Sequence, residues 1–187
     1  MVLLRSATSE FLRVVGVIPE GTWDNDTPCG HLKVHEVVNH VVAGNRFAVR
    51  VLDGESAAEA LLGLDGNLLG DDLIGATASS ATAQEDAFGA IADLDRFTVR
   101  HPAGDVSGTR FLVMRSGDLT VHGWDLARGA GVPAHLDPSL VAGLWLYVEP
   151  YVAEMARSGA YGQGATGSVA REAPDLERLL DAFGRRP

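Results

Sequence analysis

Apolar residues recur at helical spacing along most of the chain, and the clearest case lies between residues 34 and 52. Apolar side chains return there every three or four positions, as on the buried face of an amphipathic helix. The stripe consists of Val34, Val37, Val38, Val41, Val42, Val49 and Leu52. His40 follows Val37 by three residues, so it lies near the edge of the stripe and could reach the interior of a bundle.

Glycine and proline residues divide the rest of the chain into further helical segments. We expect helices at roughly 6–17, 34–52, 78–94, 107–128, 138–157 and 174–183, and a helical turn or two within 57–64. Residues 97–100 are expected to form an extended connector, and Pro150 should kink its helix. Gly129 and Gly131 end the segment that begins near Ser107. The pattern predicts an all-α fold, an antiparallel helical bundle with short extra helices.

The composition is that of one globular domain covering residues 1–187. Apolar residues make up 46% of the 187 positions and charged residues 21%. With 15 basic and 25 acidic residues the formal net charge is −10, which disfavours nucleic acid or an anionic membrane as partner because both need a basic surface. The terminal Gly184-Arg185-Arg186-Pro187 is expected to be a solvated tail.

The cysteine count and the hydropathy of the chain indicate the cellular compartment in which the protein is expected. Cys29 is the single cysteine, so no disulfide can form within the chain, which suits a reducing environment. The first residues lack the features of a signal peptide, and no stretch approaches 18 uncharged apolar residues. We therefore expect a cytoplasmic protein without a membrane span.

Asp118 and His122 are four residues apart in a predicted helix, so they share one face and can point at one divalent metal ion. If His40 faces them from its own helix, the three form a two-histidine, one-carboxylate site with coordination positions open to water or substrate. The alternative is a solvated surface pair on one helix and a hydrogen-bonded histidine on the other.

Neighbouring residues suggest supporting roles, each with a structural alternative. Asp125 follows His122 by three positions and could accept a hydrogen bond from its second ring nitrogen, or pair with Arg128 instead. Cys29 precedes a helix, where a thiol can become reactive or touch a metal, although it could equally be a packed loop thiol. Trp124 is either a packing residue or a substrate wall.

Other familiar catalytic patterns are missing. The chain has no G-x-S-x-G elbow and no H-E-x-x-H, and the glycine-rich loop at 162–167 lacks the lysine of a phosphate loop. The remaining histidines are expected to be solvent-facing, at a helix start or in loops without a partner at ligand spacing. These are His31, His35, His101 and His135.

Several segments, in this order, resemble a known family. They are Thr27-Pro28-Cys29, the run 34–47 around His40, the run 118–127 with its HGWDLA sequence, and the closing run 179–185. Together they resemble the DinB-like superfamily, in the branch related to the N-terminal domain of mycothiol-dependent maleylpyruvate isomerase. The resemblance covers nearly the whole chain. It implies a DinB-type four-helix bundle and a divalent ion, zinc or nickel, held by His40, Asp118 and His122.

The chain also differs from the isomerase in two ways, and the resemblance implies a function. Asp118 stands where the isomerase has a glutamate, and the chain ends where the isomerase would continue into a second domain. The implied function is a metal- and thiol-dependent isomerase or S-transferase, with mycothiol as cosubstrate and a small electrophile as substrate. Arg46 would steer an anionic group, or else be an ordinary surface arginine. The alternative is a non-catalytic metal- or small-molecule-binding protein for stress or sequestration. A homodimer is compatible with either.

Overall fold

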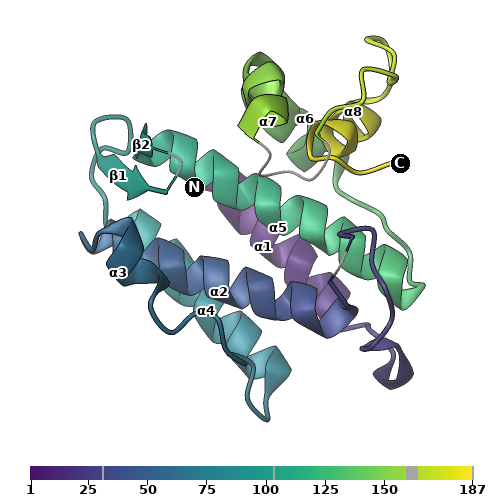
Figure 1. Cartoon of the computed structure of the whole chain (residues 1–187), viewed down its shortest axis with the longest axis horizontal. Helices are drawn as coiled ribbons and strands as arrows, with labels where there is room; N and C mark the ends of the chain where they lie inside the picture. The colour runs from purple at the N-terminus through teal and green to yellow at the C-terminus, as the bar shows by residue number, and fades with distance from the viewer. Residues whose placement is uncertain (31, 103, 159–163, 187) are drawn as a thin grey trace.

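Four helices pack side by side in the computed structural model, which describes residues 1–30, 32–102, 104–158 and 164–186 (Figure 1). They are α1 (Val2–Val15), α2 (Val34–Leu52), α4 (Leu73–Gly89) and α5 (Gly108–Ala130). Helix α1 packs mainly on α5, and α2 packs on both α4 and α5. The predicted all-α bundle is confirmed.

Helices α2 and α5 run antiparallel, and their register creates the site discussed below. Near the start of α2, His40 lies against His122 in the second half of α5, with ring centroids 4.9 Å apart. Further along α2, Phe47 lies against Phe111 at the start of α5, at 6.3 Å. The apolar stripe of α2 is buried, as the spacing of its valines predicts, except for Val49, which is partly exposed.

The C-terminal part of the chain covers the bundle on the side of α1 and α5 (Figure 1). It consists of α6 (Pro138–Val148), a 3-10 turn (Glu149–Tyr151), α7 (Val152–Ser158) and α8 (Asp175–Ala182). The 3-10 turn that contains Pro150 separates α6 from α7, so the predicted kink is confirmed. Helix α8 packs mainly on α6 and brings the chain end back toward α5.

The boundaries of two helices were wrong by several residues. Helix α1 begins at Val2 rather than near residue 6. Helix α4 begins at Leu73 rather than near residue 78, because the Asp72 side chain accepts a hydrogen bond from the Gly75 amide and caps the helix there. It ends at Gly89, before the expected residue 94. The short turns α3 (Ala57–Leu61) and 3-10 segment Glu20–Thr22 complete the helical set of the described residues.

A small β-hairpin replaces the single extended connector that the sequence predicts. Strands β1 (Thr98–His101) and β2 (Gly104–Ser107) pair antiparallel, with Val99 opposite Val106. His101 therefore lies in a strand and not in a loop. The second strand escaped prediction because four residues are too few to display the alternation of a strand.

Membrane crossing has no support among the described residues, since none of their helices combines the length and the apolar character that a span requires. Two sequence-based interpretations, those for His31 and for part of the 162–167 loop, concern residues 31 and 162–163, which lie outside the described residues.

Candidate metal centre

Three side chains from two helices, α2 and α5, converge at one point of the bundle. Nε2 of His40 on α2 lies 3.6 Å from Oδ1 of Asp118 on α5, and Nε2 of His122 lies 3.4 Å from the same oxygen. Bonds of about 2.0–2.1 Å at tetrahedral angles put two ligand atoms roughly 3.3 Å apart. The three donors therefore fit one small divalent ion, and all of them lie within 4.8 Å of one another.

The cluster is enclosed on the side of α5 and open on the other. The His122 side chain is only 8% exposed, whereas that of Asp118 is 24% exposed and that of His40 is 50% exposed. All three line a cavity of about 830 Å³, which we name the metal cavity. A metal ion held by three protein ligands at its wall would keep coordination positions free for water or substrate.

A buried arginine fixes the orientation of the Asp118 carboxylate. Arg115, one turn earlier on α5, donates to Oδ2 of Asp118 at 2.8 Å. The same guanidinium donates to Gln84 Oε1 at 2.8 Å and to Asn45 Oδ1 at 2.9 Å. With Oδ2 engaged by Arg115, Asp118 presents Oδ1 to the two histidines. The carboxylate is therefore arranged as a ligand through one oxygen.

Arg115 reaches this position because α2 carries a glycine where the two helices meet. A Cβ atom at Gly44 would lie 2.7 Å from Nη2 and 2.8 Å from Cζ of Arg115, too close for a non-bonded contact. Gly44 thus allows the guanidinium to lie between α2, α4 and α5. The sequence signal that could have revealed Arg115 is its spacing of three residues from Asp118.

The second ring nitrogen of His122 is also held in place. Nδ1 lies 3.0 Å from Oδ2 of Asp125, which is fully buried. Arg185, beyond the end of α8, donates to Asp125 from Nε at 3.1 Å and from Nη2 at 2.6 Å. Asp125 thereby fixes the ring so that Nε2 faces Asp118, which is the arrangement common around metal-binding histidines.

The expected solvated tail at residues 184–187 was therefore wrong for Arg185. This side chain is buried because it neutralises the Asp125 carboxylate, which would otherwise be an unpaired charge inside the protein. The contact spans 60 residues of sequence, and no local pattern indicates it.

Charge interactions shift the pKa values of the two α5 residues in opposite directions. Burial by itself would raise the pKa of Asp118, but the charges of Arg115 and His122 and hydrogen bonds from both histidines hold it well below its usual range. Burial would likewise lower the pKa of His122, but the Asp118 charge and hydrogen bonds to Asp118 and Asp125 raise it well above its usual range. In the absence of metal, the two form a carboxylate–imidazolium pair.

The structure places the other predicted residues at different distances from the cluster. Cys29 lines the metal cavity, and with His122 and Asp125 it forms a second group of converging donor atoms.

Arg46 is exposed, donates to the Leu68 carbonyl at 3.2 Å and does not line the metal cavity. Trp124 is buried on another face of α5, with the Arg128 guanidinium 5.7 Å from its ring centroid. Substrate binding by Cys29, Arg46 and Trp124 stays a prediction.

Two further residues of the metal cavity, besides Arg115 and Arg185, were missed by the sequence-based reasoning. His101 projects from β1 into the cavity wall, and burial together with Arg115 and Arg110 lowers its pKa, which favours the neutral ring. Phe183, just after α8, covers Gly117 on α5, where a Cβ atom would lie only 2.8 Å from the Phe183 ring. The glycine next to Asp118 therefore admits an aromatic ring of the same chain.

Fold and cluster together define a helical-bundle protein with a candidate site for one divalent metal ion. Residues 4–127 match the family described as the mycothiol maleylpyruvate isomerase N-terminal domain. The match includes α2, most of α5 and all three candidate ligands. The chain therefore belongs to this mycothiol-related family of metal-binding domains.

Individual proteins show the same relationship. Uncharacterized proteins from two strains of Mycobacterium tuberculosis are each 29% identical over 165 residues, which is 85% of this chain and 82% of theirs. A crystal structure of a mutant of mycothiol-dependent maleylpyruvate isomerase superposes with a TM-score of 0.60. It covers 88% of this chain and 71% of the isomerase at 18% identity, a likeness that shows the shared fold.

Proposed function

We propose that this chain is a metal- and thiol-dependent enzyme of the isomerase or S-transferase type. Its cosubstrate would be mycothiol or a similar low-molecular-weight thiol, and its substrate a small electrophilic molecule. The observation that carries the proposal is the convergence of His40, Asp118 and His122 at the wall of an open cavity. Membership in a family named for a mycothiol-using isomerase supports the choice of thiol.

The three donors suit zinc or nickel, since two imidazoles and one carboxylate oxygen are ligands that both ions accept. Such an ion would lower the pKa of a thiol in the cavity, so that thiolate forms near neutral pH. The protein's own groups would do the rest. Arg115 would keep Asp118 aligned, Asp125 would keep His122 aligned, and the cavity walls would place the electrophile beside the sulfur.

The alternative is metal or small-molecule sequestration without catalysis, and one observation favours it. Cys29, His122 and Asp125 form a second donor group that could close the site around an ion. This group is the poorer one because Arg185 already engages both Asp125 oxygens, and a metal there would compete with a buried ion pair. Among the described residues, Cys29 does not join His40 and Asp118 in one four-donor cluster.

Elemental analysis of the purified protein beside His122→Ala tests the site. His135→Ala is the matched control, because His135 is an exposed histidine away from the cavity. We expect near-stoichiometric zinc or nickel in the native protein and the control, and its loss in His122→Ala. An absence of metal in the native protein, even after reconstitution, would contradict the proposal.

Turnover then separates the two functions. Maleylpyruvate, the substrate named for the related isomerase, would be incubated with the metal-loaded protein, with and without mycothiol. Consumption that requires mycothiol and disappears in His122→Ala supports the enzyme. Bound metal without thiol-dependent consumption of maleylpyruvate or of other small electrophiles supports sequestration.

A further inference from the structure

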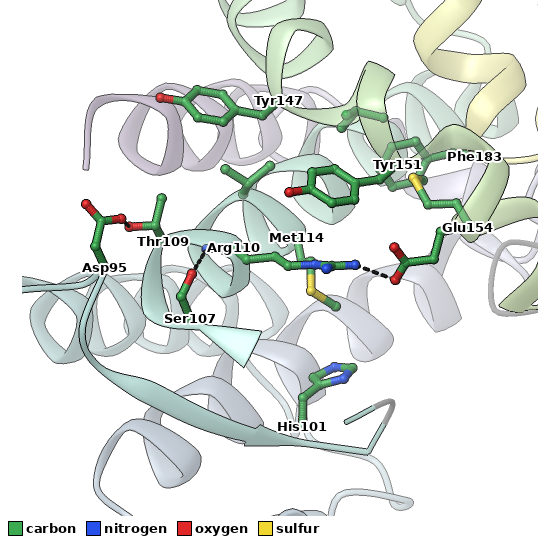
Figure 2. Close-up of a pocket in the computed structure, with 13 residues that line it drawn as sticks. Asp95, His101, Ser107, Thr109, Arg110, Met114, Tyr147, Tyr151, Glu154 and Phe183 are labelled. Atoms are coloured by element: carbon green, nitrogen blue, oxygen red, sulfur yellow. Dashed lines mark hydrogen bonds and ion pairs between the residues drawn. The ribbon is translucent and has the colours of Figure 1, made fainter. Parts of the chain in front are cut away.

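A second cavity of about 330 Å³ lies next to the metal cavity, between the β-hairpin, the start of α5 and the α6–α7 segment (Figure 2). We name it the apolar cavity. Three residues line both cavities and form the boundary between them: His101, Met114 and Phe183. Its size falls within the range of small-molecule sites in proteins.

The walls of the apolar cavity offer flat and adaptable surfaces. Tyr147 and Tyr151 come from the C-terminal segment (Figure 2), and Phe183 adds a third aromatic ring that also borders the metal cavity. The thioethers of Met114 and Met155 complete these walls. Aromatic rings pack well against other aromatic rings and against methionine sulfur, so these walls favour an aromatic ligand.

Four polar side chains of the apolar cavity already form two pairs, Arg110 with Glu154 and Thr109 with Asp95. Arg110 donates to Glu154 at 2.6 Å, and its guanidinium lies 4.5 Å from the Tyr151 ring centroid. The Thr109 hydroxyl donates to Asp95 at 2.6 Å. Arg110 therefore already has an acidic partner in Glu154, which weakens its attraction for a carboxylate ligand.

The net charge of the residues that line the apolar cavity also disfavours an anionic ligand. Among the described residues that line the apolar cavity, Asp95 and Glu154 are acidic and Arg110 is basic, while His101 favours its neutral ring. The lining thus carries more negative than positive charge, which disfavours an anion. An uncharged ligand suits both the charge and the apolar walls.

The boundary residues connect this cavity to the candidate metal centre. The Phe183 ring lies over Gly117, next to Asp118 on α5. Met114 lies one turn before Asp118 on the same helix and borders both cavities. A ring held in the apolar cavity would therefore lie against side chains that also line the cavity of His40, Asp118 and His122.

We propose that the apolar cavity binds an uncharged aromatic group of the electrophilic substrate, so that the reacting carbon extends past Phe183 into the metal cavity. This inference rests on the proposed function, because it names the substrate class of that same site. The substrate would then be a neutral aromatic compound with an electrophilic substituent.

Binding of two isosteric probes tests the charge and the location together. Acetophenone and benzoate share a phenyl ring and a planar substituent of similar size, but only benzoate is an anion. Each would be titrated into the purified full-length protein and followed by ligand-observed NMR. We expect acetophenone to bind at least about tenfold more tightly than benzoate.

Two tryptophan substitutions locate the site. Val113→Trp places a large ring in the apolar cavity and should weaken acetophenone binding by at least about tenfold. Val132→Trp is the matched control, because Val132 is also partly buried but lines neither cavity, and it should leave binding unchanged. Tyr147→Ala provides a second test if Val113→Trp does not fold, since Tyr147 is 48% exposed and its removal should weaken binding without unfolding the protein.

The results are independent of the proposed catalysis. Equal or tighter binding of benzoate would overturn the inference, and so would no binding of either probe. Acetophenone binding that Val113→Trp and Tyr147→Ala leave unchanged would also overturn it. Because the titration contains no thiol and follows no turnover, a failure here leaves the metal and turnover experiments to decide the proposed function separately.

Discussion

Gly44 and Arg115 show how one missing side chain shapes the candidate centre. The guanidinium of Arg115 is held by Asn45, Gln84 and Asp118, so it has little freedom to move away from a Cβ atom at position 44. We expect Gly44→Ala to lower the free energy of unfolding by about 1–3 kcal/mol, as overpacking does, despite the better helix propensity of alanine. Urea unfolding would measure this.

Gly123→Ala is the control for Gly44→Ala. Both glycines lie inside long helices, but a Cβ atom at Gly123 would meet Phe11 at 3.8 Å, an ordinary contact. It should therefore be neutral or stabilise by up to about 1 kcal/mol. If the two variants changed stability alike, the close approach of Arg115 would not be the reason that position 44 requires a glycine.

His122 makes the stability of the metal-free protein depend on pH in a defined direction. Its pKa is raised above the ordinary value of 6.5 by Asp118 and Asp125. The contribution of its charged form is therefore fully present below about pH 6.5 and is lost as the pH rises through the raised pKa. Urea unfolding of chelator-treated native protein and His122→Gln, between about pH 5.5 and 9, should show a stability difference that shrinks toward high pH. A difference that grows with pH would contradict this assignment.

At the scale of elements, the segment after α8 supports α5 through one ion pair. Arg185 engages Asp125, whose side chain has no exposure to solvent. Arg185→Gln would leave that carboxylate with only His122 as a charged partner, so we expect a loss of about 3 kcal/mol in unfolding free energy. Chemical denaturation would measure it, and metal affinity should fall as well, because the His122 ring loses its fixed orientation.

The neighbouring arginine is the matched control for Arg185. The Arg186 side chain is 47% exposed and lies 3.4 Å from Asp181, which keeps its hydrogen bonds from Thr166. Arg186→Gln should cost no more than about 1 kcal/mol. Equal losses in the two variants would mean that the buried pair contributes nothing beyond the general charge of the segment.

The sequence could predict local relationships but not the contacts between distant elements. Helical periodicity was enough to predict α2, glycine residues marked the end of α5, and spacing alone placed Asp118 and His122 on one face. The approach of His40 depends on the register between two helices, which periodicity does not determine and only the family resemblance implied. Arg185 reaches Asp125 across 60 residues, and Phe183 fills the space left by Gly117, so both required the folded chain.

At the scale of the whole molecule, the candidate centre joins the two halves of the bundle, because His40 comes from α2 while Asp118 and His122 come from α5. A metal ion bound only by the folded protein stabilises it by about 2.7 kcal/mol at a hundred times its dissociation constant. For a chain of this length that corresponds to a rise in Tm of about 5–10 °C, which a chelator should reverse. We expect His40→Ala to lose this rise, whereas His35→Ala, which changes another partly exposed histidine of α2, should keep it. Thermal unfolding with and without zinc or nickel would measure the shift. A rise that persists in His40→Ala would mean that the ion binds without α2. The group formed by Cys29, His122 and Asp125 would then be the better candidate for the metal site.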